Sequence, residues 1–165
     1  MRLFRPPATA VVIPVPEAAA VVDSSEPGMP PHVTLLWPFV RRPRGRHRRG
    51  LADIAAAHAR FDFTLTRVGE FPGAVYLAPE PAAPFVGLVR AITTKWPRRQ
   101  PYDGKYGDVI PHLTLRLGGA PLTDEERAEL EAALPIRCSA TEILLLVPDG
   151  GGWREVYRLP LRPAP

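Results

Sequence analysis

The spacing of hydrophobic residues changes along this chain and predicts alternating strands and helices. Phe85, Leu88, Val89, Ile92 and Trp96 recur at helical spacing, which predicts an amphipathic helix over residues 84–96. Other stretches alternate apolar and polar residues with period two, as half-buried strands do. The predicted strands are residues 8–15, 61–71, 74–79, 143–147 and 155–161, and the further predicted helices are residues 17–23, 51–61 and 123–134.

Two further strands carry a repeated motif. The segments PPHVTLLWPFV and VIPHLTLRLGG, about 80 residues apart, both contain Pro-His-x-Thr-Leu, and such internal repetition indicates related structural units. Each copy is accompanied by a helix and a pair of strands. The pattern therefore predicts two pseudo-equivalent lobes, and 165 residues suffice for one domain that contains both.

Composition and charge narrow the class of protein. The chain is 45% hydrophobic, carries a formal charge of +4 and has a sequence pI near 9.7, which fits a compact domain with a polyanionic partner. Cys138 is the only cysteine, so an intramolecular disulfide and a thiolate metal cluster are excluded and a cytoplasmic location is expected. No apolar run is long enough to cross a membrane, and nothing in the chain indicates an obligatory protein partner.

The repeated motif places an imidazole and a hydroxyl on one face of each strand. Because side chains alternate, His32 and Thr34 lie about 7 Å apart on the same face, as do His112 and Thr114. If the two lobes face each other, one His can accept a proton while the other donates one. The hydroxyls can then donate hydrogen bonds to the oxygens of a phosphodiester.

Two other interpretations of the motif remain open. Pro often begins a strand, and a His beside a core strand is commonly just hydrogen-bonded, so each copy alone is compatible with a purely structural role. Zinc is the other common use of paired His, but zinc sites have three or four ligands and neither copy supplies a third. We therefore expect no metal and no cofactor.

PHVTLLWPF and PHLTLRLG resemble the two H-x-T/S-x signatures of the 2H phosphoesterase superfamily. The order of elements is similar to that of its bacterial 2'-5' RNA ligase-like, RNA 2',3'-cyclic phosphodiesterase branch. The resemblance implies a bilobal α+β fold with two antiparallel sheets that flank a cleft. It also implies metal-independent attack on a 2',3'-cyclic phosphate of RNA or of a nucleotide. In it, His32 would be the proton donor, His112 the acceptor, and Thr34 and Thr114 the phosphate ligands, with 2'-5' ligation as the reverse reaction.

Two further groups of residues are candidates for binding. Arg116 follows Thr114 by two residues, so alternation predicts that it shares the face of Thr114 and contacts the phosphate, or else is an exposed Arg at a strand end. The segment RRPRGRHRRG, with Arg residues between positions 41 and 49, reads as a basic loop that either follows an RNA backbone or is merely solvated. The alternative function is accordingly a noncatalytic RNA-binding module that uses this loop.

Overall fold

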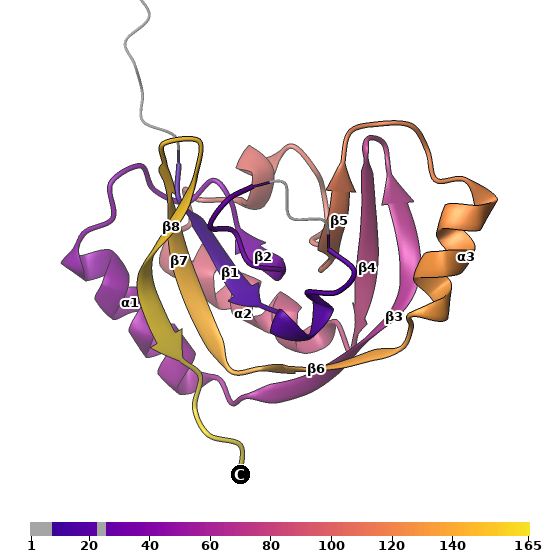
Figure 1. Cartoon of the computed structure of the whole chain (residues 1–165). Coiled ribbons are helices and arrows are strands. Elements are labelled where there is room, and N and C mark those ends of the chain that lie inside the picture. Colours follow the sequence, from indigo (N-terminus) through magenta and orange to yellow (C-terminus); the bar gives the residue numbers. More distant parts are fainter. Residues whose placement is uncertain (1–7, 23–25) are drawn as a thin grey trace, which may run out of the picture.

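The computed structural model describes residues 8–22 and 26–165 and contains an antiparallel sheet with flanking helices (Figure 1). The strands are β1 (Ala10–Pro14), β2 (His32–Leu36), β3 (Phe61–Phe71), β4 (Ala74–Glu80), β5 (Leu113–Leu117), β6 (Ile136–Ala140), β7 (Glu142–Asp149) and β8 (Gly152–Pro160). The α-helices are α1 (Gly45–Ala57), α2 (Ala83–Lys95) and α3 (Asp124–Ala132), and short 3-10 helices occur at η1 (Pro16–Ala18) and η2 (Pro101–Gly104).

The eight strands form one sheet in the order β6-β3-β4-β5-β2-β1-β7-β8. The α+β class is therefore confirmed, but the two predicted sheets are joined into one. The strands that carry the repeated motif, β2 and β5, lie side by side at the centre and pair antiparallel at Val33 and Leu113. Each of them leads outward to three further strands on its own side. The two halves of the sheet thus meet at the strands that carry the motif. One half contains β3 to β6, from the middle of the chain, and the other contains β1, β2, β7 and β8, from its two ends.

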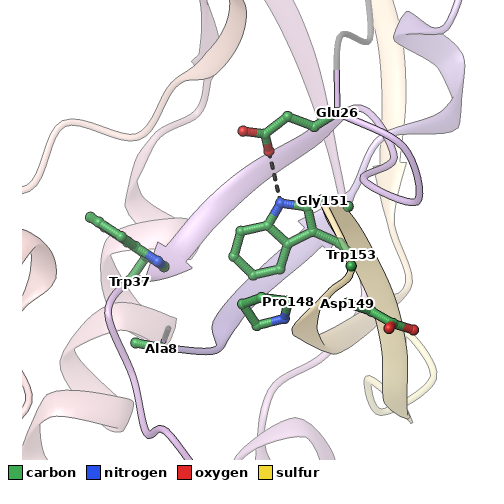
Figure 2. A pocket seen from close by; sticks show the side chains of 9 residues that line it. Ala8, Glu26, Trp37, Pro148, Asp149, Gly151 and Trp153 are labelled. Carbon is green, nitrogen blue, oxygen red and sulfur yellow. Dashed lines mark hydrogen bonds between the residues drawn. The ribbon is translucent and has the colours of Figure 1, made fainter. Parts of the chain in front are cut away.

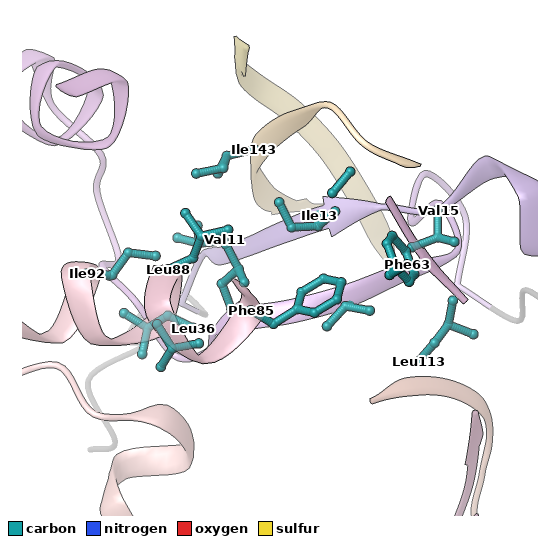
Figure 3. Packing of buried hydrophobic residues seen from close by; sticks show 14 of the residues in the cluster. Val11, Ile13, Val15, Leu36, Phe63, Phe85, Leu88, Ile92, Leu113 and Ile143 are labelled. Carbon is teal, nitrogen blue, oxygen red and sulfur yellow. The ribbon is translucent and has the colours of Figure 1, made fainter. Parts of the chain in front are cut away.

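The main hydrophobic core fills the space between one face of the sheet and the helices. Phe85 of α2 is fully buried, and its ring meets those of Phe61 and Phe63 edge-on at centroid distances of 5.0 Å. Figure 3 shows Phe63 and Phe85 among the core residues. Val33 and Leu113 belong to the same core. Because side chains alternate along a strand, the residues next to Val33 and Leu113 face away from this core.

Helix α1 begins earlier than predicted and takes up part of the basic segment. It starts at Gly45 rather than at residue 51 and ends at Ala57. The backbone N–H of Arg44 donates to Nδ1 of His47 at 2.9 Å, which caps the first turn. His47 itself is only 5% exposed and packs against Phe39 and Trp96. The prediction of a basic loop was therefore wrong for residues 45–49.

Other elements differ from their predicted limits in smaller ways. The helix predicted at residues 17–23 is a single 3-10 turn, Pro16–Ala18, and residue 23 lies outside the described residues. Strand β6 was not predicted. Helix α3 lies within the predicted residues 123–134 and begins with a capping box between Thr123 and Glu126. No helix within residues 8–22 and 26–165 is long and apolar enough to cross a membrane.

Candidate active site

Four side chains of the repeated motif gather on the sheet face opposite the core. Val33 pairs with Leu113, and both are fully buried. In an antiparallel pair this register sets His32 across from Thr114 and Thr34 across from His112. The two imidazoles are then diagonal neighbours, about 7–8 Å apart at their Cα atoms. The sheet thus brings together the residue set that the motif predicted.

Both imidazoles make the same hydrogen bond to the backbone. Nδ1 of His32 lies 2.8 Å from the carbonyl oxygen of Pro30, and Nδ1 of His112 lies 2.7 Å from that of Ile110. A carbonyl oxygen only accepts hydrogen bonds, so Nδ1 carries the proton in each ring. In the neutral rings Nε2 is consequently the nitrogen with a free lone pair, and it is the atom that can exchange a proton with a substrate.

The proline of the motif accounts for these bonds. Each accepting carbonyl belongs to the residue two positions before the His, with Pro31 or Pro111 between them. A residue that precedes proline is restricted to extended conformations, and this restriction fixes the direction of its carbonyl group. The shared Pro-His dipeptide thus selects the same tautomer in both copies.

The surroundings keep both rings neutral to lower pH than in water. Burial lowers the pKa of His32; the hydrogen bond to Pro30 and the charge of Glu26 raise it, and His112 lowers it. Burial also lowers the pKa of His112, against the opposing effect of its bond to Ile110. A carboxylate therefore acts on His32 but is not among the groups that shift His112, and this makes the two chemically similar rings unequal.

We expect both rings to titrate below pH 6.5 in the folded protein, with the Nδ1–H tautomer at high pH. The unfolded chain binds protons near 6.5, so these two residues lower the free energy of unfolding as the pH falls through the folded-state pKa values. Ring nitrogen chemical shifts measured by NMR across about pH 4.5–8.5 give the pKa and the tautomer of each ring directly. The same titration in urea gives the His pKa values of the unfolded chain. A folded-state pKa above the unfolded value contradicts the expectation.

A β-bulge in each motif strand changes which residues face the site. Thr34 pairs with Val12 but Leu36 pairs with Val11, so Leu35 is the extra residue in β2. Likewise, Thr114 pairs with Tyr76 but Arg116 pairs with Val75, so Leu115 is the extra residue in β5. In each strand the two residues that follow the Thr both point to the core side of the sheet. From there on, the residues face the opposite side from the one that simple alternation predicts.

Arg116 consequently lies on the side of the sheet opposite Thr114, and the prediction that the two share a face was wrong. Its register partner Val75 is a core residue. The guanidinium donates to the carbonyl oxygen of Ala120 at 3.1 Å and lies 3.5 Å from Glu126 of α3. Nε is buried without a hydrogen-bond partner among the described residues. We therefore assign Arg116 no contact with the substrate.

Two aromatic residues hold the ring of His112, and the sequence analysis missed both. Phe71 and Tyr76 stack at a centroid distance of 4.3 Å, and His112 meets both at 5.1 and 5.6 Å. Tyr76 pairs with Thr114, so it stands next to the site on β4. A side chain at Gly69 would collide with the Tyr76 ring. The available signal was the alternation of AVYLAP, which sets Tyr76 on the face opposite Val75 and Leu77.

The basic segment lies apart from the four motif residues. Arg46, Arg48 and Arg49 belong to the first turns of α1, and Leu51 and Ile54 of the same helix pack into the main core. Helix α1 therefore covers the face opposite the one that carries His32 and His112. No three His, Cys, Asp or Glu side chains lie together as metal ligands would within the part of the chain that the structure describes.

Comparison with known proteins identifies the family. The model of the 2'-5' RNA ligase superfamily matches residues 8–152, while no curated protein matches the chain. E. coli LigT complexed with NADP+ is similar at a TM-score of 0.62 and 18% identity, over 96% of this chain and 99% of that chain. LigT complexed with 3'-AMP has a TM-score of 0.60 and 17% identity, over 94% of this chain and 98% of that chain. The protein TT0787 of Thermus thermophilus has a TM-score of 0.59 and 16% identity, over 94% of this chain and 98% of that chain. Because the family model covers most of its length, the chain belongs to the 2'-5' RNA ligase superfamily.

Proposed function

We propose that this protein is a metal-independent phosphodiesterase that opens 2',3'-cyclic phosphate ends of RNA or of nucleotides, with 2'-5' ligation as the reverse reaction. The observation that carries the proposal is the pair of matched hydrogen bonds from His32 and His112 to backbone carbonyls. They leave two Nε2 atoms on one sheet face beside two hydroxyls. That set supplies an acid, a base and phosphate ligands without a cofactor.

The reaction needs one proton taken and one given. His112 accepts a proton from water at Nε2 as the water oxygen attacks phosphorus. The bond from phosphorus to one ribose oxygen breaks, and His32, which starts as the imidazolium with a proton on each ring nitrogen, donates its Nε2 proton to that leaving oxygen. Thr34 and Thr114 hold the non-bridging oxygens so that the attacking and leaving oxygens stay in line. The product is a phosphomonoester next to a free ribose hydroxyl.

The charges near the two rings support this division of roles. Glu26 raises the pKa of His32, against the larger lowering effect of burial, whereas no carboxylate is among the groups that shift the pKa of His112. The charge of Glu26 therefore favours the protonated form of His32. The negative charge of a bound phosphate acts in the same direction. We place the activity in the cytoplasm because the single cysteine, Cys138, is a buried free thiol.

The test is turnover by the purified chain of 2',3'-cyclic mononucleotides and of oligonucleotides with cyclic ends, each with and without chelator. We expect a monophosphate product and equal rates in the two conditions, because no bound metal hydroxide takes part. Loss of activity that zinc restores contradicts the metal-independent mechanism. RNA binding without any turnover would instead support the RNA-binding module based on residues 41–49.

A further inference from the structure

A groove of about 550 Å³ opens beside the candidate active site, between two tryptophans (Figure 2). Trp37, which follows β2, and Trp153 of β8 lie on its two sides, and Pro148 and Ala8 line it between them. Its size is in the range of small-molecule sites. His32 and His112 do not line it, so it is a separate cavity with aromatic walls.

Trp153 is held in a fixed position before any ligand arrives. Its indole Nε1–H donates to Oε2 of Glu26 at 2.8 Å, and its backbone N–H donates to the carbonyl oxygen of Pro27 at 2.8 Å. The close approach of these two segments requires glycine at position 28, where φ is +80° and a Cβ would lie 1.9 Å from the Trp153 oxygen. A ring ordered in advance loses little entropy when a flat ligand stacks on it.

The groove lies on the same sheet face as the four motif residues. Trp153 packs over a small cluster that includes Val12, and Val12 pairs directly with Thr34. The bulge at Leu35 turns Leu35 and Leu36 to the core and brings Trp37 back to the face of Thr34. Trp37 stands three positions after Thr34, about 10 Å along an extended chain.

Glu26 connects the groove to the candidate active site. It lines the groove, accepts the indole hydrogen bond of Trp153 and lies close enough to His32 to act on it electrostatically. Trp37, on the other side, is 42% exposed, so part of its ring surface is available to a ligand. A ligand whose phosphate rests on Thr34 and Thr114 therefore has aromatic surface within reach for its remaining part.

We propose that the groove between Trp37 and Trp153 binds the nucleobase of the substrate by stacking. This inference rests on the proposed function, because it takes the phosphate of the same nucleotide to lie between His32 and His112. Every base has an aromatic face, so the groove favours nucleotides over sugar phosphates without selecting one base. Stacking of this kind changes affinity about 5- to 150-fold per base.

The test is titration of intrinsic tryptophan fluorescence with adenosine 2'-monophosphate and, separately, with ribose 5-phosphate. We expect quenching and tighter binding with the nucleotide alone. Trp37→Ala and Trp153→Phe should each reduce the quenching, and Trp37→Ala should weaken nucleotide binding at least about 5-fold while leaving ribose 5-phosphate binding unchanged. The third tryptophan, Trp96, packs against Phe39 away from the groove, so Trp96→Phe should keep the full quenching.

The outcomes separate this inference from the proposed function. Equal affinity for the two ligands, or nucleotide binding that is unchanged in both Trp37→Ala and Trp153→Phe, overturns the nucleobase groove even if cyclic phosphates are turned over. Quenching that disappears only in Trp96→Phe overturns it as well. Base-dependent quenching without any turnover of cyclic phosphates overturns the proposed function and leaves the groove in place.

Discussion

His32→Ala and His112→Ala each lower kcat/KM for a 2',3'-cyclic phosphate by about 10²–10⁴-fold, because each removes one general acid or base. The double variant loses little more than the worse single variant, since both rings serve one transition state and their effects do not add. Thr34→Ala and Thr114→Ala cost less, because the two hydroxyls share the positioning of the phosphate. Steady-state kinetics with one cyclic mononucleotide measures all five variants.

His58 offers a matched control for these variants. Its Nδ1 lies 2.7 Å from the carbonyl oxygen of Ile54, so it makes the same type of bond as the two motif His residues, but at the end of α1. We expect His58→Ala to retain the wild-type kcat/KM. Near-full activity in either His32→Ala or His112→Ala contradicts the acid and base roles and gives the repeated motif a structural role only.

Phe85→Ala lowers the free energy of unfolding by about 3–5 kcal/mol, as expected when a buried aromatic side chain is removed from a packed core. Phe85 is fully buried, and its ring contacts Phe61 and Phe63 across the interface between α2 and the sheet. The deletion therefore removes apolar contacts from both layers and leaves a cavity between them. Urea unfolding followed by circular dichroism measures the change.

Arg90→Ala is the control on the same helix. Arg90 is exposed on α2, and substitutions at such positions usually change stability by no more than about 0.5 kcal/mol. A loss in Arg90→Ala as large as that in Phe85→Ala would show that α2 responds to any change, and that packing of the aromatic ring is not the cause.

The placement of the four motif residues on one sheet face could be predicted from the sequence because their signal is local and repeated. Two copies of Pro-His-x-Thr-Leu specify an extended strand, a fixed tautomer and a shared face, and all three depend on residues within a few positions of each His. The motif itself does not indicate which strand it pairs with. The pairing of Val33 with Leu113 was not predicted, because two separate sheets that face each other across a cleft were expected from the sequence.

Arg116 shows where the period-two rule fails. Alternation placed it with Thr114, but the extra residue at Leu115 reverses the pattern one position earlier. A bulge is a property of two paired strands, because it is defined by the register of the partner, and so a single strand read alone does not reveal it. The same irregularity in β2 moves Trp37 to the face of Thr34, where it lines the groove that we propose as a nucleobase site.

The start of α1 was missed for a different reason. Six Arg residues in the segment 41–49 suggested a basic loop, and cations near the N-terminus of a helix are indeed unfavourable. Tertiary contacts outweighed that preference: His47 is buried between Phe39 and Trp96 and accepts the capping hydrogen bond from Arg44. The charges of the neighbouring residues do not predict that His47 is buried against aromatic residues from other parts of the chain.

The central pairing of the sheet has a consequence for how the protein acquires activity. Val33 and Leu113 are roughly 80 residues apart in sequence, and their pairing closes one of the longest loops in the fold. Contacts of such high sequence separation have a high entropic cost and tend to form slowly. Neither half of the chain holds a complete set of proton donor and acceptor. Recovery of turnover after dilution from denaturant should therefore require this long-range closure and come later than the recovery of secondary structure.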